Sequence, residues 1–248
     1  MTNGDGFWVR SLAETHPSGG RILNHQHPWG QLAYAVSGVM RIATPTALWI
    51  TPPTRAVWIP PGRPHEITMQ GATAMRSLYI DPESAARLPR DEAVFEVAPL
   101  LRELILHILG VGMLGPGKDS HERLAGLLID LLLTARRQDL SLPLPRDRRA
   151  RAMAERVQAD PSSSANLADL AREAGASLRT LQRLFPAQTG LTLEAWRQKA
   201  RLIAGVAALS GGGSVTATAL DCGYESPSAF ITAFKRQFGV TPGKFRAP

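Results

Sequence analysis

The segment Phe234-Lys-Arg-Gln237-Phe-Gly239-Val-Thr241-Pro-Gly-Lys-Phe245-Arg246 repeats an earlier segment, Phe185-Pro-Ala-Gln188-Thr-Gly190-Leu-Thr192-Leu-Glu-Ala-Trp196-Arg197. Phe, Gln, Gly, Thr, an aromatic residue and Arg coincide at a constant offset of 49 residues. Upstream, the copies also match at an offset of 48, where Leu167, Ala171 and Gly175 recur as Val215, Ala219 and Gly223. Two long copies in register indicate a duplicated structural unit.

Each copy has the layout of a helix-turn-helix unit. Ala171 is small enough for a second helix to cross closely, and Gly175 supplies the left-handed conformation that ends the first helix. Ser177 is then the predicted N-cap of the second helix. In the second copy these roles fall to Ala219, Gly223 and Ser226, followed by Pro227. A helical bundle without DNA contact is the structural alternative.

The outward positions of the two second helices are candidates for DNA contact. Arginine can bind guanine through two hydrogen bonds and glutamine can pair with adenine. The expected base-reading residues are Arg179, Thr180, Gln182 and Arg183 on the first helix, and Ser228, Ile231 and Thr232 on the second. The expected phosphate contacts are Arg201, Lys235 and Arg236. For any one of the charged residues, a simple solvated surface is the alternative.

The charge distribution separates the chain into two halves. Residues 146–248 hold 15 of the 28 Lys and Arg residues and 8 of the 21 Asp and Glu residues, so the net charge of +7 lies entirely in this half. A neutral half joined to a basic half suits a sensor attached to a nucleic-acid reader. Abundant arginine from a high-GC coding sequence would produce the same count.

The first hundred residues have a different texture. Short apolar runs rich in Val, Ile, Trp and Tyr alternate with Pro and Gly turns, which predicts an antiparallel β-barrel or sandwich over residues 1–99. Two helical stripes follow, at Leu100–Ile108 and Leu124–Leu132. We expect residues 100–147 to form a helical connector, ending in a proline-containing linker at Ser141–Asp147. The stripes predict either a homodimer surface or packing on the barrel.

The C-terminal residues 148–248 resemble the AraC/XylS regulators throughout, with matches strongest at Leu167–Phe185 and Gly223–Arg246. The resemblance implies two helix-turn-helix subdomains, at about 165–186 and 214–236, joined by a long helix at Thr192–Leu209. Their expected partner is double-stranded operator DNA, with RNA polymerase added if the regulator activates. The stretches His27–Gly38 and Val57–Gly62 resemble the subgroup that regulates drug-efflux transporters, including the nitroimidazole-resistance type.

The N-terminal segments Gly19–Gly38 and Pro60–His65 resemble the two cupin motifs. This resemblance implies a double-stranded β-barrel with a central pocket. His25 and His27 are spaced to point the same way from one strand, and His65 can complete three ligands for a divalent transition metal. Gln31 replaces the usual acidic ligand, and Met69 replaces the usual Asn. The alternative is a polar histidine pocket without metal. The predicted effector site contains His25, His27, Gln31, Tyr34, Trp58 and His65.

The remaining expectations concern function class and location. A metal-dependent cupin enzyme, such as a dioxygenase or isomerase, is the alternative to a regulator, but Glu66 is the one candidate for a general acid or base, and a DNA reader would then be idle. A single cysteine, Cys222, excludes an internal disulfide. The absence of a long apolar run and of a signal-like start predicts a soluble, cytoplasmic, non-membrane protein.

Overall fold

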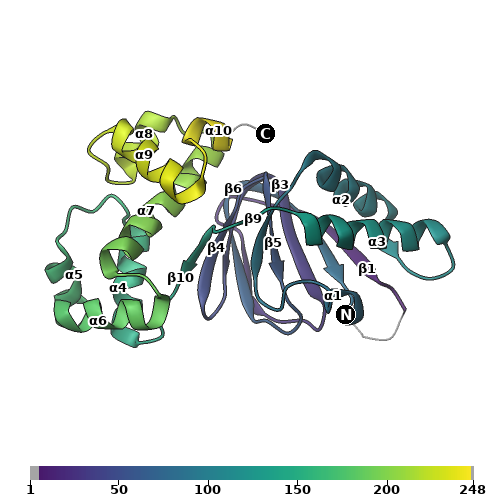
Figure 1. Cartoon of the computed structure of the whole chain (residues 1–248), viewed down its shortest axis with the longest axis horizontal. Helices are drawn as coiled ribbons and strands as arrows, with labels where there is room; N and C mark the ends of the chain where they lie inside the picture. The colour runs from purple at the N-terminus through teal and green to yellow at the C-terminus, as the bar shows by residue number, and fades with distance from the viewer. Residues whose placement is uncertain (1–5, 247–248) are drawn as a thin grey trace. The chain divides into compact units, whose positions relative to one another are not determined.

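The computed structural model of the chain describes residues 6–246 (Figure 1). The outermost ends of the two predicted domains, 1–5 and 247–248, lie outside the described residues. Contacts within the chain define two compact units. The first comprises the residues up to Thr44 together with 51–140, and the second comprises 45–50 and the residues from Ser141 onward.

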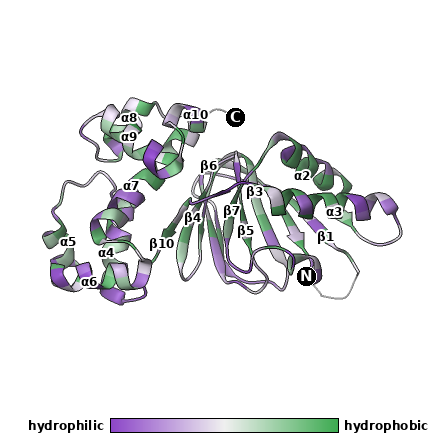
Figure 2. Cartoon of the chain, viewed as in Figure 1, coloured by the Kyte–Doolittle hydropathy of each residue, from purple (hydrophilic) through white to green (hydrophobic). Residues whose placement is uncertain are grey.

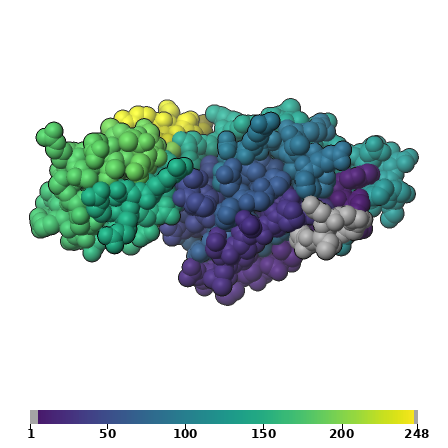
Figure 3. Space-filling model, turned by 90° about the horizontal axis from the view of Figure 1, so that it is seen from below, coloured from purple at the N-terminus to yellow at the C-terminus, as the bar shows by residue number. Residues whose placement is uncertain are grey.

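The first unit is built on an antiparallel sheet. Its strands follow the order β8-β1-β6-β3-β5-β7-β9, and β2 pairs with β6. Their bounds are β1 Val9–His16, β2 Arg21–His25, β3 Gly30–Ala43, β5 Arg55–Ile59, β6 His65–Ile80, β7 Ala93–Glu96, β8 Met113–Leu114 and β9 Arg137–Gln138. On the face drawn in Figure 3, the N-terminal part of the chain (purple) forms one region of the surface. The expected N-terminal β fold is confirmed.

Alternation along the strands separates two faces of the sheet. In β6, buried positions alternate with partly exposed ones from His65 to Met69 and again from Thr73 to Ser77, as the period of two requires. Gln31 in β3 lies opposite Tyr79 in β6 and Ile59 in β5, whereas the next residue, Leu32, faces the other side. The sheet therefore has a histidine-bearing face and a face covered by helices.

Helices α2 (Pro99–Val111) and α3 (Asp119–Thr134) cover that second face, while α1 (Pro82–Ala85) is a single turn (Figure 1). Figure 2 shows α2 as largely hydrophobic. Ile105, Leu128 and Leu132 are buried in one cluster with Leu32, which lies on the sheet. The stripes that predicted a dimer surface therefore pack on the sheet. Contacts place residues 100–140 in the first unit, although the sequence indicated a separate connector there.

The second unit is mostly helical. A short strand pair, β4 (Ala47–Thr51) with β10 (Ser141–Pro143), precedes seven helices in the described range. The helices are α4 Arg148–Ala159, α5 Leu167–Glu173, α6 Leu178–Thr189, α7 Leu193–Ser210, α8 Val215–Asp221, α9 Pro227–Phe238 and α10 Pro242–Arg246. The two helix-turn-helix units are α5–α6 and α8–α9, with α7 between them. The expected C-terminal helical fold is confirmed.

The turns of both units are built as the repeat predicts. Gly175 and Gly223 have φ values of +71° and +72°, which glycine adopts without strain. Ser177 caps α6 by accepting from Thr180 N at 3.2 Å, and Ser226 caps α9 by accepting from Ala229 N at 3.2 Å. The long helix begins one residue later than expected, because Thr192 serves as its N-cap.

Candidate functional site

Three histidines meet on the histidine-bearing face of the sheet. His25 ends β2, His65 begins β6, and these two residues are paired in register. His27 lies in the turn between β2 and β3 rather than on one strand with His25, yet its ring centroid is 5.2 Å from that of His65. The ring centroids of His25 and His65 are 4.3 Å apart, and one nitrogen from each of the three rings lies within 4.8 Å of the others.

The Nδ1 atom of each ring lies at hydrogen-bond distance from a backbone carbonyl. Nδ1 of His25 lies 2.9 Å from the Leu23 carbonyl oxygen, Nδ1 of His27 lies 2.6 Å from that of Trp29, and Nδ1 of His65 lies 2.9 Å from that of Arg63. A carbonyl oxygen only accepts, so each Nδ1 carries the proton and donates. With its proton on Nδ1, a neutral imidazole keeps a lone pair on Nε2, which is the arrangement found in metal-binding histidines.

Burial keeps His65 neutral. Its side chain is fully buried, and this burial lowers its pKa to about 4. The hydrogen bond to the Arg63 carbonyl opposes that shift, while charge on His25 or His27 would strengthen it. At neutral pH, Nε2 of His65 is thus an acceptor with no proton of its own.

Gln31 brings a fourth acceptor to the same place. This side chain is 1% exposed, and its Oε1 lies 3.0 Å from Nε2 of His65 and 3.2 Å from Nε2 of His27. Its Nε2 donates to Ser77 Oγ at 3.0 Å, which directs Oε1 toward the histidines. The Gln31 amide therefore bridges the rings of His27 and His65 at hydrogen-bond distance, and its oxygen is available as a further ligand for a cation held by the rings.

The sequence did not identify Ser77 and Tyr79 as parts of this site. Tyr79 lies edge-on to His27 with ring centroids 5.1 Å apart, and burial raises its pKa to about 12. Both residues share odd parity with His65 along β6, so strand alternation was the signal that would have found them.

Tyr34 and Trp58 were expected as walls of the site, and the structure places them elsewhere. Both belong to the core between the sheet and the helices, where the Trp58 indole donates to the Pro89 carbonyl at 2.9 Å. Tyr34 is three positions from Gln31, and an odd separation along a strand sends two side chains to opposite faces.

The second unit presents the expected DNA-facing residues on the surface of α6 and α9. Arg179, Gln182 and Arg183 are exposed on α6, while Thr180 is partly buried and its hydroxyl also pairs with that of Ser177, at 2.9 Å. On α9, Ile231 is partly exposed and the other candidates are exposed: Ser228, Thr232, Lys235 and Arg236. Arg236 also donates to Gln198 Oε1 at 3.2 Å.

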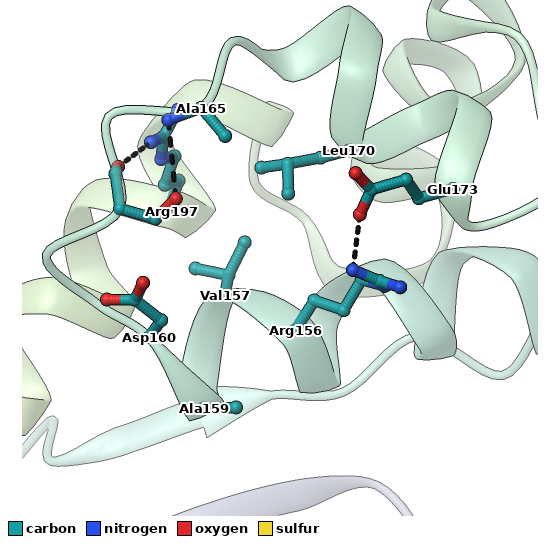
Figure 4. Close-up of a pocket in the computed structure, with 9 residues that line it drawn as sticks. Arg156, Val157, Ala159, Asp160, Ala165, Leu170, Glu173 and Arg197 are labelled. Carbon is teal, nitrogen blue, oxygen red and sulfur yellow. Dashed lines mark hydrogen bonds and ion pairs between the residues drawn. The ribbon is translucent and has the colours of Figure 1, made fainter.

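Arg201 has a role that its sequence position did not predict. Its guanidinium donates to the carbonyls of Pro161 and Ser163, both at 2.9 Å, in the loop before α5. Arg197 donates to the same Ser163 carbonyl (Figure 4). Across a hollow of about 310 Å³, Arg156 of α4 pairs with Glu173 of α5. These arginines brace the first helix-turn-helix unit, so the expected phosphate contact of Arg201 competes with a structural one.

Two family models match this chain. An AraC-like ligand binding domain covers residues 7–185, and a helix-turn-helix domain covers residues 170–248. The chain belongs to the AraC family of transcription regulators. It is a DNA-binding regulator with a ligand-binding domain, as the sequence predicts.

Relatives of this AraC-family chain include two named regulators. It is 35% identical to the HTH-type transcriptional regulator NimR of Escherichia coli K12, over 90% of this chain and 81% of NimR. It is 35% identical to the HTH-type transcriptional regulator RipA of Corynebacterium glutamicum over 42% of this chain and 31% of RipA. ToxT of Vibrio cholerae has a solved structure that covers 96% of both chains with 12% identity and a TM-score of 0.42. Within residues 6–246 of this chain, no helix is both long enough and apolar enough to cross a bilayer.

Proposed function

We propose that this regulator responds to a divalent transition metal bound by His25, His27 and His65. The observation that carries the proposal is that one nitrogen from each of the three rings lies within 4.8 Å of the others, while Nδ1 of each ring contacts a backbone carbonyl, which leaves Nε2 as the ligand atom. Neutral imidazole nitrogens with a nearby amide oxygen suit a transition metal such as Zn²⁺, Ni²⁺ or Co²⁺. The metal would act as an effector that favours one state of the sensor.

Chemical details of the site support this assignment. Each histidine ring is already oriented, so binding orders few side chains. Gln31 supplies the amide oxygen, and Ser77 holds that amide in place. Because a ligand shifts an equilibrium only through different affinities for two states, the metal must bind the DNA-competent and DNA-incompetent states unequally.

The test combines metal binding with DNA binding. The full-length chain, stripped with a chelator, is titrated with Zn²⁺, Ni²⁺ and Co²⁺, and its affinity is measured for a duplex that the wild-type chain selects from a random pool. At least one metal should bind at one equivalent and change DNA affinity by about fivefold or more. His27→Ala should lose both effects and keep DNA binding without metal. His107→Ala, an exposed histidine on α2, is the matched control.

Two results would count against the proposal. If no metal binds, the triad is a polar pocket, and a small-molecule effector takes the metal's place as the candidate ligand. If a metal binds without changing DNA affinity, its role is structural. The enzyme alternative would need a free acid or base beside the triad, and Glu66 is instead paired with Arg21 at 2.6 Å. The relatives of this chain are transcription regulators, and we assign the chain the same role.

The biological setting that we propose has four further parts. The regulator acts in the cytoplasm as a homodimer, contacts RNA polymerase if it activates, and controls an efflux transporter gene. The dimer has one structural support, which is the exposure of Leu100, Leu127 and Leu133 on α2 and α3. Mapping the DNA bound across the source genome would test the identity of the target gene.

A further inference from the structure

The linker at Ser141–Asp147 is built into the second unit. The indole Nε1 of the fully buried Trp196 donates to the Pro143 carbonyl at 2.6 Å. The Trp196 ring lies edge-on to Phe185 of α6, with centroids 5.3 Å apart. The linker is therefore hydrogen-bonded to a residue that packs directly on the first recognition helix.

A second contact joins the other end of the linker to α6 itself. Oε1 of Gln188, in the last turn of α6, accepts from the backbone N–H groups of Arg146 and Asp147 at 2.8 and 2.9 Å. Asp147 is also the N-cap of α4, and its carboxylate accepts from Arg149 N at 2.9 Å. Gln188 thus accepts from the N-cap residue of α4 and from the residue before it, and it fastens the linker to the end of the recognition helix.

The rest of the linker has little freedom. Pro143 and Pro145 have no N–H group and a fixed φ. Leu144 donates its N–H to the Thr46 carbonyl at 2.8 Å, and Arg146 and Asp147 donate to Gln188. Gln188 is exposed, so a substitution there removes two hydrogen bonds without opening a cavity.

The internal repeat supplies a natural comparison. Gln237 occupies the position of Gln188 in the second copy and lies in the last turn of the equivalent helix, α9. Within residues 6–246, the Gln237 side chain makes no hydrogen bond, so the helix-turn-helix fold itself does not require this contact. The glutamine makes the bond in the copy that adjoins the linker.

We propose that Gln188 is a positioning residue that couples docking of the linker to the placement of recognition helix α6. When the linker is docked, α6 is held in the orientation that reads DNA; when it is released, α6 loses that restraint and DNA affinity falls. Because coupling between two equilibria is reciprocal, binding of DNA must also strengthen linker docking. The linker is therefore one route by which a change in the N-terminal half reaches the first recognition helix. This inference does not depend on the identity of the effector.

The test measures both directions of the coupling on the full-length chain. The DNA probe is the duplex selected from a random pool by the wild-type chain. Hydrogen exchange at the Arg146 and Asp147 amides should slow by about fivefold or more when this duplex is added. In Gln188→Ala these amides should exchange quickly with or without DNA, and DNA affinity should fall by about fivefold or more. Gln237→Ala should behave like wild type in both measurements.

A conservative variant separates coupling from general loss of structure. Gln188→Glu keeps an acceptor oxygen at the N-terminus of α4, so it should restore amide protection and DNA affinity, whereas Gln188→Leu should restore neither. The proposal fails if the amides of Gln188→Ala stay protected. It also fails if those amides are released while DNA affinity is unchanged, or if Gln188→Ala and Gln237→Ala lose the same affinity.

Discussion

Oε1 of Gln31 lies 3.0 Å from Nε2 of His65, within hydrogen-bond distance, in the middle of the histidine triad. A cation bound to Nε2 of His65 would also meet the partial negative charge of this amide oxygen. Gln31→Glu replaces the amide oxygen with a charged carboxylate and should raise the affinity for Zn²⁺ or Ni²⁺ by about tenfold or more. Calorimetric titration measures the change, and Gln70→Glu on the exposed part of β6 is the control. Unchanged affinity in Gln31→Glu would remove Gln31 from the ligand set.

The exposed arginines of α6 should read bases, and the lysine of α9 should bind phosphate. Arg179→Ala or Arg183→Ala should cost about 1–3 kcal/mol on the cognate duplex and reduce the preference over scrambled DNA. Lys235→Ala should weaken binding to both duplexes and lower the salt slope by about 0.9. Fluorescence anisotropy at several salt concentrations distinguishes the two patterns. Equal binding of cognate and scrambled duplexes by the unmodified chain would refute base reading.

The two turn glycines should respond unequally to the same substitution. Gly175→Ala places a side chain at φ +71° in open space and should destabilise the chain by about 1 kcal/mol. Gly223→Ala adds a collision, because its Cβ would lie 3.0 Å from the Ser162 carbonyl oxygen and 3.1 Å from Nη2 of Arg201. Thermal unfolding should therefore show the larger loss for Gly223→Ala. Equal losses would mean that the loop moves away at no cost.

Two neighbouring leucines on α3 allow packing of the core to be tested separately from dimer formation. Leu128 is 0% exposed and Leu127 is 41% exposed. Leu128→Asp should unfold the first unit, since it buries an unpaired charge in the core. Leu127→Asp should leave the fold intact and, if α3 takes part in a dimer, yield a monomer in light scattering. A folded dimer of Leu127→Asp would place any dimer contact elsewhere.

The single cysteine gives a prediction for alkaline pH. Burial raises the pKa of the Cys222 thiol to about 11, from an ordinary value of 9. The unfolded chain loses this proton first as pH rises, so the contribution to stability is complete below pH 9 and is lost as pH rises toward 11. Between pH 8 and 10 the loss is about 1 kcal/mol, and it should be absent in Cys222→Ala. Urea unfolding at the two pH values measures this loss in both proteins. The difference between them is due to Cys222 alone, because the variant keeps every lysine and tyrosine that titrates in the same range.

The parts of the fold that local chemistry determines were predictable from the sequence. Gly175, Ser177 and Ser226 occupy the roles expected of them, because a positive φ and a helix cap depend on a few adjacent residues. The histidine triad was predictable from motif spacing, although His27 lies in a turn. These features need no knowledge of which distant segments meet.

The features that depend on distant pairing were not predictable. Which face of β3 carries the site is set by its register with β6, and that register includes bulges between Ala35 and Val39. Tyr34 was assigned to the wrong face although alternation from Gln31 would have excluded it, whereas Trp58 was misassigned because its face depends on its distant pairing with Leu32. The leucines of α2 and α3 form an apolar stripe, but a stripe does not indicate which surface will cover it. Side-chain bonds to loop carbonyls, such as those of Arg201, leave no pattern in the sequence.

The donation from Trp196 to Pro143 restricts how this regulator can be divided or recombined. A fragment that starts at the first residue of α4 would leave a buried indole N–H without an acceptor, at a cost of about 1–3 kcal/mol. It would also lack residues 45–50, which belong to the same compact unit yet are encoded far upstream. Chimeras that join a foreign sensor at position 148 should therefore be poorly soluble or bind DNA weakly. Chimeras that retain the paired strands β4 and β10 should bind DNA normally. In this chain, the boundary between the two compact units therefore does not fall at a single point in the sequence.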